Sequence, residues 1–429
     1  MTKHHPSKGQ SQEPQDRSLR SYLGDDFILP HYQGGSILNI ADSVCRWFDI
    51  PTFGIGPLKD NILSGVESPI QKVVLVIVDA VSYHHFQEWT QNRDSAFWET
   101  LRSVGDLSAI TSISPSTTCA AMSSLWTGQP AGRHGVSGYE MWMKEYSMAV
   151  NMIVHGPTTF HKGGGTLLRT GFDPTTFLPL PTLGTHLQAH GIEAHAFQHH
   201  SILHSGLSRT FLHDVTLHGI NTPADMWISV RELLESQPDK KTFISAYWGA
   251  VDGYFHRFGP SDERAGAEFN SFTHHLHDQC LGALSPQAKK GTLFILTADH
   301  GQVFTPFNPD YDLNNHPTMT DMLHIMPTGE NRLAYLHVRP GKIQAVQDYI
   351  TEHWPDQFQC HPSQDLSSAG LFGPAPFHPQ WQSRIGDLSV IAKNDAYLWW
   401  STDVNDLLGR HGGLSEREMR VPFLTLPLS

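Results

Sequence analysis

The chain has 429 residues, enough for two or three domains or for one large α/β domain with an insertion. It carries 42 acidic and 29 basic residues, a net charge of −13, which leaves no broad cationic surface for a nucleic-acid backbone. The charge therefore disfavours a nucleic-acid polymer as partner.

Cysteine usage and hydropathy narrow the class of protein further. The four cysteines, Cys45, Cys119, Cys280 and Cys360, lie far apart and form no C-x-x-C pair, so neither a zinc knuckle nor a disulfide framework is expected. No apolar run approaches the roughly 20 residues of a membrane span, and the N-terminus lacks the apolar core of a signal peptide. We therefore expect reduced thiols, no membrane partner and a cytoplasmic location. The sequence does not indicate the oligomeric state.

The N-terminal third contains two strands with polar side chains after them. Residues 1–20 start with a polar stretch that predicts a disordered tail. Six aliphatic residues, Val73 to Val78, predict a strand buried on both faces that ends at Asp79. A second strand over 107–113 precedes a helix over 119–126, which stops at Thr127-Gly128. Thr118 is thus predicted at the N-terminus of a helix.

Strands and helices alternate through the middle of the chain, after an irregular stretch over 138–180 that predicts loops with room for a hairpin. The expected elements are a helix over 182–190, strand 192–197, helix 224–234, strand 242–248, helical spacing over 265–280 and strand 292–297. This alternation predicts the α/β class, with a mostly parallel central sheet and helices on both faces.

Residues 302–385 break the alternation. A long loop rich in Pro and Asn is followed by a strand over 333–338 and an amphipathic helix over 343–354, which we interpret as an inserted cap. The catalytic α/β domain would then comprise residues 21–301 and 386–429. Its last elements would be strands at 387–391 and 421–426.

Seven side chains that can bind metal ions follow the predicted strands or precede the last one. They are Asp79, Thr118, Asp252, His256, Asp299, His300 and His411. Open α/β sheets place their sites at the carboxyl ends of the strands, so these groups are expected to converge. Three carboxylates, three imidazoles and one hydroxyl match the donors needed by two adjacent Zn²⁺ ions, with Mn²⁺ or another divalent ion as a replacement.

Each residue also has an ordinary structural interpretation. Asp79 alone could be a turn carboxylate, Thr118 an N-cap, and His256 the i,i+4 neighbour of Asp252 on a helix. These interpretations would require five coincidences in one order along the chain, which favours the site. His316 competes with His411, since it too follows Asp299-His300, and the run into Val421-Pro422 favours His411.

The charge of the site indicates its substrate. Two Zn²⁺ ions and three carboxylates leave about one positive charge, which an ionised Thr118 would neutralise. Such a site suits a phosphodiester better than a doubly charged phosphomonoester. A hydroxyl beside zinc and at a helix N-terminus ionises readily, so Thr118 could attack phosphorus while the Asp252, His256 and His411 set stabilises the leaving oxygen and then activates water.

Five ordered motifs closely resemble the alkaline phosphatase superfamily, and within it the type I phosphodiesterase/nucleotide pyrophosphatase family. They are Val78-Asp79-Ala80, Pro115-Ser-Thr-Thr118 with Thr127-Gly128 and His134-Gly135, Asp252-Gly-Tyr-Phe-His256-Arg-Phe-Gly-Pro260, Thr297-Ala-Asp299-His300-Gly301, and His411-Gly-Gly with the run to Val421-Pro422. The likeness covers about residues 70–425. It implies one zinc held by Asp79, Asp299, His300 and Thr118, and the other by Asp252, His256 and His411.

One departure from that family concerns the phosphoryl-binding Asn, which relatives place about twenty residues after the nucleophile. Here the stretch reads Val136-Ser-Gly-Tyr139-Glu, so Tyr139 or a backbone N–H would have to bind the phosphoryl oxygen. Arg332 and Arg384 could reach a substrate carboxylate or phosphate, although surface pairing is the simpler expectation. Tyr247 is expected in the core rather than against substrate.

The sequence therefore predicts a two-zinc hydrolase of phosphodiesters or nucleotide pyrophosphates that acts through a phospho-threonine on a small phosphorylated substrate. A phosphonate C–P hydrolase of the phosphonoacetate type is an alternative, because it shares the metal ligands and the threonine. A non-catalytic, metal-dependent binder of a phosphorylated ligand is another, because the Asn is missing.

Overall fold

The computed structural model describes residues 14–63, 66, 69–91, 98, 105–159 and 164–428. The predicted tail over residues 1–20 falls largely outside this range. Its last part differs from the prediction, because the chain forms helix α1 (Pro14–Leu23) from Pro14 onwards.

A seven-stranded sheet forms the centre of the larger part of the molecule, in the order β2-β16-β9-β1-β8-β6-β7. Six strands are parallel, and β16 runs antiparallel to its neighbours β2 and β9. The strands are β1 (Lys72–Val78), β2 (Asp106–Thr111), β6 (Glu193–His199), β7 (Thr216–Ile220), β8 (Thr242–Trp248), β9 (Thr292–Thr297) and β16 (Arg420–Leu428). The predicted α/β class with a mostly parallel sheet is confirmed.

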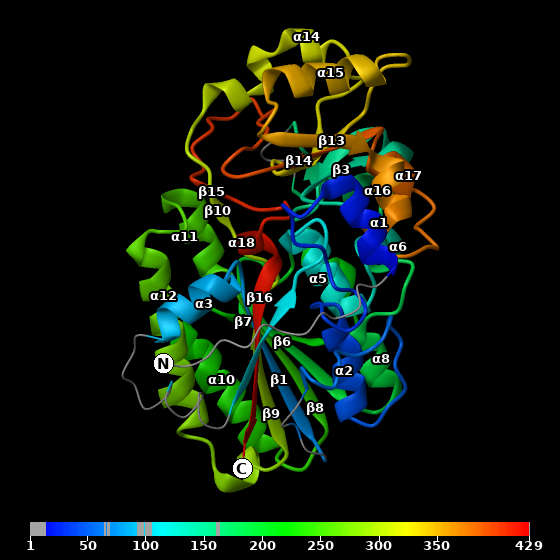
Figure 1. The fold of residues 1–429 in the computed structure, drawn as a ribbon. Helices are drawn as coiled ribbons and strands as arrows, with labels where there is room; N and C mark the ends of the chain where they lie inside the picture. Colours follow the sequence, from blue (N-terminus) through cyan, green and yellow to red (C-terminus); the bar gives the residue numbers. More distant parts are fainter. Residues whose placement is uncertain are drawn as a thin grey trace.

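Helices cover both faces of this sheet (Figure 1). One face carries α3 (Tyr83–Gln91), α10 (Pro223–Ser236) and α12 (Glu263–His275), and the other carries α2 (Asn39–Trp47), α5 (Thr118–Thr127) and α8 (Leu183–Ala189). Every residue of β1 is buried as a result. This explains why its sequence is continuously aliphatic rather than alternating.

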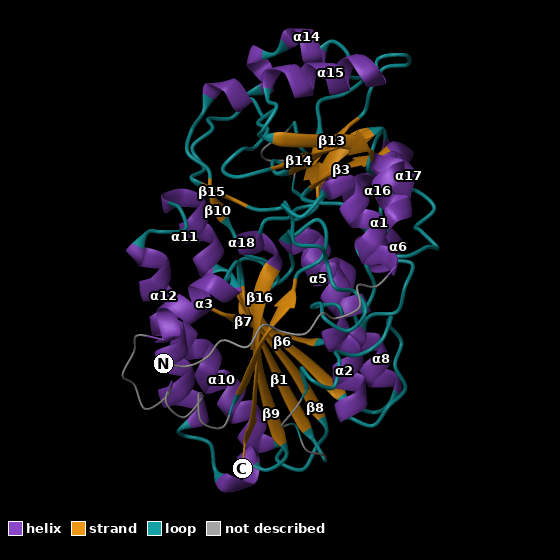
Figure 2. Ribbon diagram, in the orientation of Figure 1, coloured by secondary structure: helices purple, strands orange, loops and turns teal. Residues whose placement is uncertain are grey.

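A second seven-stranded sheet, antiparallel at each of its strand pairings, lies beyond the carboxyl ends of the first sheet (Figure 2). Its strands in spatial order are β13 (Phe358–Pro362), β14 (Leu388–Ala392), β12 (Leu333–Leu336), β11 (Thr328–Glu330), β3 (Glu140–Met143), β4 (Met148–Asn151) and β5 (Gly156–Pro157). The β3–β4 hairpin falls in the stretch predicted as loops with a hairpin.

The strand predicted over 387–391 is present as β14, but not in the main sheet where we expected it. It pairs with β12 and β13 on either side. The second sheet therefore takes strands from the 302–385 segment and from both flanking parts of the chain. The division into a catalytic domain and an inserted cap remains a prediction, and its boundary at 385/386 does not coincide with an edge of this sheet.

The remaining elements are short or lie on the outside of the two sheets. The helices are α6 (Ala131–His134), α7 (Pro174–Phe177), α9 (Gly206–Phe211), α11 (Ala250–Phe258), α13 (Pro286–Lys289), α14 (Pro317–Thr320), α15 (Ile343–His353), α16 (Ser363–Ala369), α17 (Trp381–Arg384) and α18 (Glu416–Met419). Five further short turns of helix are η1 (Lys144–Tyr146), η2 (Thr166–Thr170), η3 (Leu276–Leu281), η4 (Pro309–Tyr311) and η5 (Leu313–Asn315), and a small ribbon pairs β10 (Val303–Phe304) with β15 (Gly409–Arg410).

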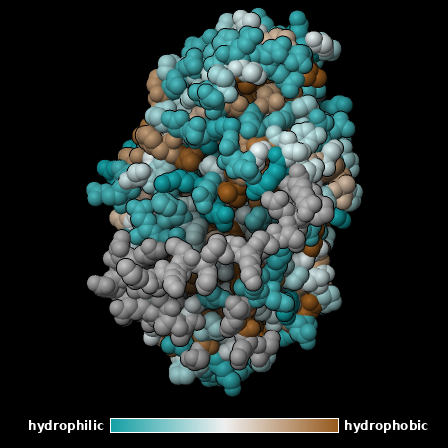
Figure 3. Space-filling view, viewed as in Figure 1, coloured by the Kyte–Doolittle hydropathy of each residue, from teal (hydrophilic) through white to brown (hydrophobic). Residues whose placement is uncertain are grey.

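The distribution of residues on the surface and the state of the cysteines both agree with what the sequence predicts. Hydrophilic residues dominate the described part of the face in Figure 3, with apolar residues in small separate patches, the usual distribution when most large apolar side chains are in the core. All four cysteines are free thiols, and Cys45, Cys119 and Cys280 are buried. Among the described residues, no helix combines the length and the apolar character needed to cross a bilayer.

Candidate active site

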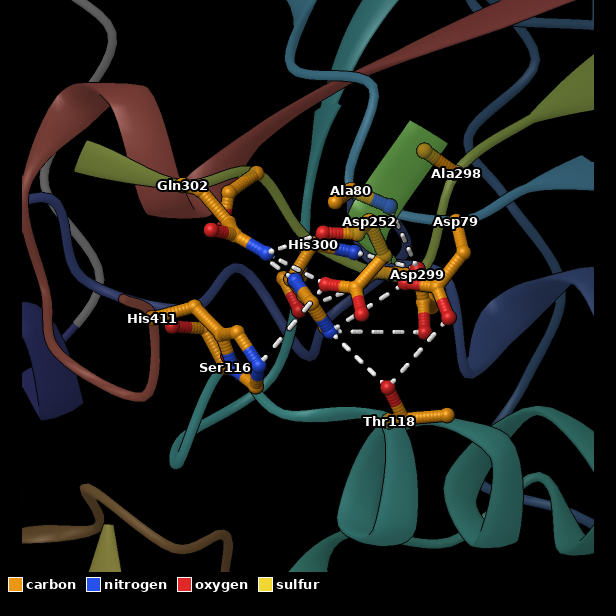
Figure 4. Close-up of polar contacts among 12 residues, drawn as sticks. Asp79, Ala80, Ser116, Thr118, Asp252, Ala298, Asp299, His300, Gln302 and His411 are labelled. Carbon is orange, nitrogen blue, oxygen red and sulfur yellow. Dashed lines mark hydrogen bonds and ion pairs between the residues drawn. The ribbon is translucent and has the colours of Figure 1, made fainter. Parts of the chain in front are cut away.

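The first cluster of polar groups lies where β1 and β9 end side by side. Asp79 follows β1, and Asp299 and His300 follow β9; all three are buried. His300 Nε2 lies 3.5 Å from Asp79 Oδ1, 3.5 Å from Asp299 Oδ2 and 3.1 Å from the Thr118 hydroxyl (Figure 4). The Thr118 hydroxyl is also 3.5 Å from Asp79 Oδ2. These four predicted residues therefore converge on one point.

The second cluster adjoins the first. Asp252 and His256 lie one turn apart on α11, so both project from the same side of the helix, and His256 Nε2 is 3.4 Å from Asp252 Oδ2. His411 Nε2 lies 3.9 Å from Asp252 Oδ1. The His411 ring stacks on the His300 ring with 4.0 Å between centroids, which joins the two clusters. All seven predicted residues thus lie in one site.

Each of the three histidines is oriented by a backbone carbonyl. Nδ1 of His256 is 2.8 Å from the Gly409 oxygen, Nδ1 of His300 is 3.1 Å from the Gly301 oxygen, and Nδ1 of His411 is 3.2 Å from the Ser116 oxygen. A carbonyl can only accept, so Nδ1 carries the proton and Nε2 keeps its lone pair directed into the site. This arrangement is typical of histidines that bind metal ions.

The donor set fits divalent cations. Ligand atoms of Asp252, His256 and His411 lie within 4.8 Å of one another, and so do those of Asp79, Asp252 and His300. Asp79 Oδ1 and Asp299 Oδ2 are buried without a hydrogen-bond donor among the described residues. Burial and the nearby Asp299 and Asp252 carboxylates raise the pKa of Asp79 well above its usual value. A bound cation would satisfy these oxygens and offset the repulsion between the carboxylates.

The hydroxyl of Thr118 lies at the N-terminus of α5. Thr118 is the first helical residue and is partly exposed, whereas the rest of α5 is buried. Thr117 occupies the N-cap position, but its side chain makes no capping hydrogen bond. The first-turn N–H groups of α5 have no intrahelical acceptor, so this end of the helix can bind an anion beside the Thr118 hydroxyl.

Two polar residues that were not among the predicted site residues contact the carboxylates directly. The Tyr247 hydroxyl donates to Asp79 Oδ2, and the Gln302 amide donates to Asp252 Oδ1. Tyr247 was expected in the core, and it does pack against the core with its ring. Burial and the charges of Asp79 and Asp299 raise the pKa of Tyr247 well above its usual value, so its hydroxyl remains a donor. Each cluster thus has one carboxylate held by a neutral donor.

We expect Tyr247→Phe to weaken the binding of a divalent cation about tenfold, with zinc as the probe, because groups that orient metal ligands typically contribute 10- to 100-fold in affinity. Calorimetric titration of the metal-free protein with zinc measures this effect without any substrate. Tyr335→Phe is the matched control, because Tyr335 is fully buried and its hydroxyl has no hydrogen-bond partner among the described residues. Equal zinc affinity in the two variants would contradict the prediction.

The contacts of Tyr139 differ from the phosphoryl-binding role predicted for it. Its backbone N–H donates to Glu330 Oε1 at 2.6 Å, and its hydroxyl accepts from the Asn151 amide at 2.5 Å. The N–H is therefore not free to replace the missing Asn. The role of the Tyr139 side chain in substrate binding stays a prediction.

Three other sequence expectations can be compared with the structure. His316 binds the Asp310 oxygen and the Tyr349 hydroxyl, both at 2.9 Å, and packs in the core of the second sheet rather than in the site. Arg332 and Arg384 were expected on the surface but are buried. Arg332 pairs with Glu418, and Arg384 binds the Gly135 oxygen and Glu145.

Several solved structures have the same fold as this chain. Murine ectonucleotide pyrophosphatase/phosphodiesterase 5 matches with a TM-score of 0.58 at 17% identity, over 83% of this chain and 88% of that one. The human protein of the same name gives the same values. Phosphonoacetate hydrolase from Sinorhizobium meliloti 1021, in complex with phosphonoformate, matches with a TM-score of 0.60 at 16% identity, over 83% and 90% of the two chains. No curated protein matches the sequence.

The mainly parallel sheet with helices on both faces is the fold that these solved structures share with the chain. The model of the family described as type I phosphodiesterase / nucleotide pyrophosphatase matches residues 73–414. The chain belongs to that family, and the resemblance expected from its motifs is confirmed. Membership supports a hydrolase of the phosphodiesterase or pyrophosphatase type.

Proposed function

We propose that the protein is a two-zinc hydrolase of phosphodiester or nucleotide pyrophosphate bonds, with Thr118 as the nucleophile. The observation that carries this proposal is the place of the Thr118 hydroxyl. It lies at the open N-terminus of α5, 3.1 Å from His300 Nε2, at the edge of a site lined by three carboxylates and three imidazoles. The murine neighbour also occurs as an inactive threonine-to-alanine variant in complex with AMP, which is consistent with a nucleotide ligand.

The seven residues divide into two ligand sets. Asp79, Asp299, His300 and the Thr118 hydroxyl would hold one ion, and Asp252, His256 and His411 the other. Bound zinc ions would supply positive charge that lowers the pKa of adjacent oxygen groups and stabilises the charged transition state. Mn²⁺ or another divalent ion would offer the same chemistry.

The residues act in two steps. Thr118 Oγ1 attacks phosphorus in line, so the Oγ1–P bond forms, the bond to the leaving oxygen breaks with its electron pair on that oxygen, and the Thr118 proton passes to solvent. First-turn N–H groups of α5 donate to the phosphoryl oxygens, where negative charge develops. In the second step water attacks phosphorus and the Oγ1–P bond breaks. Thr118 regains a proton and the phosphoryl group leaves with the oxygen of water.

The net charge of the metal-loaded site favours a phosphodiester as substrate. Two divalent cations with three carboxylates and an ionised threonine are close to neutral, so a singly charged phosphodiester is accommodated better than a dianion. The two arginines that the sequence allowed for a second substrate charge are engaged elsewhere, Arg332 with Glu418 and Arg384 with Glu145.

The test compares bis(p-nitrophenyl) phosphate with p-nitrophenyl phosphate on the zinc-loaded protein. We expect kcat/KM for the diester to exceed that for the monoester by about tenfold or more, because one extra unit charge at 4 Å costs several kcal/mol in a partly buried site. Chelation should remove the activity and added zinc should restore it. A preference for the monoester would contradict the proposal.

A phosphonate C–P hydrolase is a second candidate, favoured by the structural likeness to phosphonoacetate hydrolase. Release of inorganic phosphate from phosphonoacetate, with no release of nitrophenol from the diester, would support it. Two bound zinc ions without turnover of either substrate would instead indicate a non-catalytic binder of a phosphorylated ligand. The cytoplasmic location and the small phosphorylated partner remain predictions.

A further inference from the structure

Gln302 is a neutral residue beside the second cluster of candidate ligands. It is fully buried, one residue before β10, and its side chain is directed at the carboxylate of Asp252 (Figure 4). The Gln302 amide nitrogen donates to Asp252 Oδ1 and also lies 3.4 Å from the Asp252 carbonyl oxygen. Gln302 therefore holds one oxygen of this carboxylate in place.

The bond to Gln302 distinguishes the two carboxylate oxygens of Asp252. Among the described residues, Asp252 belongs to both groups of candidate ligands, so its carboxylate lies between the positions of the two ions. Oδ1 accepts from the Gln302 amide, whereas Oδ2 lies 3.4 Å from His256 Nε2. A lone pair that accepts an N–H is not available to a cation. Oδ2 is therefore the oxygen better placed to bind an ion together with His256.

Gln302 also contacts the segment that orients His256. Its amide oxygen is buried without a hydrogen-bond donor among the described residues, and it faces Gly409, where an added Cβ would lie 2.5 Å away. The Gly409 carbonyl oxygen is the acceptor that orients His256, at 2.8 Å from Nδ1. The ribbon of β10 and β15 joins the two residues, because β10 begins directly after Gln302 and Gly409 pairs with Phe304.

We propose that Gln302 is a positioning residue for the second ion, because it holds Asp252 directly and packs on the Gly409 backbone that holds His256. This inference rests on the two-ion site of the proposed function. It assigns the two ions to different neutral side chains, the first to Tyr247 and the second to Gln302. A change at residue 302 should therefore weaken the binding of one ion and spare the other.

The experiment titrates the metal-free full chain with zinc, in competition with a chelator, so that the affinities of the two ions are resolved. Gln302→Met keeps the length of the side chain and removes the donor. We expect it to weaken the binding of one ion about tenfold and to leave the other within about threefold of wild type. Gln129→Met is the matched control, because Gln129 is also buried and its amide donates to the Phe53 carbonyl, outside the site. It should bind both ions as wild type does.

A second background identifies the ion that depends on Gln302. The double variant His256→Ala/His411→Ala lacks two of the three proposed ligands of the second ion and should bind one zinc ion. In that background Gln302→Met should not change the affinity for the remaining ion. A general loss of packing around residue 302 would lower that affinity, so this measurement separates a positioning role from a structural one.

Unchanged affinity for both ions in Gln302→Met, or an equal loss of both, would overturn the inference. A further loss of affinity in the His256→Ala/His411→Ala background would overturn it too. A wild-type protein that binds fewer than two zinc ions would contradict both the two-ion site and the inference. If the loss is confined to the second ion but the wild-type protein hydrolyses no diester, the inference holds and only the proposed function is wrong.

Discussion

Replacement of Thr118 by alanine is expected to lower kcat for bis(p-nitrophenyl) phosphate by about 10⁴-fold or more, the scale found when a catalytic nucleophile is removed. In the proposed mechanism the hydroxyl forms the bond to phosphorus, and its neighbours are the acidic and imidazole groups proposed to hold the metal ions. For the proposed two-zinc site, zinc content should remain near two ions, since six of the seven proposed ligands are retained. Steady-state kinetics and elemental analysis measure the two quantities on the same samples.

Thr118→Ser is the matched control, because it keeps a hydroxyl at the same position on α5 and should retain a substantial part of the activity. Acid quenching of the wild-type protein during turnover of the diester should trap a nitrophenyl phosphoryl group on Thr118, which mass spectrometry of the peptide would locate. Undiminished activity in Thr118→Ala would exclude this residue as the nucleophile. Loss of zinc together with activity would instead assign Thr118 a role in metal binding alone.

The main sheet could be predicted because its strands carry local signals. The aliphatic run of β1 and the Thr292–Thr297 run of β9 each end within two residues of a candidate ligand, and both strands form as expected. Parallel strands end at the same edge of a sheet, so the convergence of Asp79, Asp299 and His300 followed from topology. His256 followed from helical spacing to Asp252.

The second sheet could not be predicted because its pairings are non-local. Its strands have at most five residues and come from both sides of the 302–385 segment. The apolar run of β14 resembles a strand of the main sheet, and nothing within it specifies β12 and β13 as neighbours. Register and partners of such short strands are decided by tertiary packing rather than by local sequence.

The residues that support the site were missed for a related reason. Tyr247 and Gln302 are neutral, and only the fold shows that they donate to Asp79 and Asp252. Metal ligands are recognisable by residue type and by their position after strands, whereas the groups that orient them can be of many types and lie anywhere in the chain.

The ion pair between Arg332 and Glu418 supports the His411 loop from behind. Both side chains are fully buried, with Arg332 Nε 2.7 Å from Glu418 Oε1 and Nη2 3.1 Å from Oε2. Glu418 also accepts from the N–H groups of Gly413 at 2.8 Å and Ser415 at 3.2 Å. One carboxylate thus connects the turn between β11 and β12 to the segment that directly follows His411.

Arg332→Met is therefore expected to lower the free energy of unfolding by about 3–5 kcal/mol, because it leaves the Glu418 charge buried without its partner. Denaturant titration measures the change. Arg384→Met is the matched control, since Arg384 is equally buried but its partner Glu145 is 31% exposed and can be hydrated when the arginine is removed, so the loss should be smaller. Equal losses in the two variants would show that arginine packing, rather than the buried carboxylate, determines the cost. Since the carboxylate holds Gly413, Arg332→Met should also weaken zinc binding at the ion site proposed for His411, whereas Arg384→Met should not.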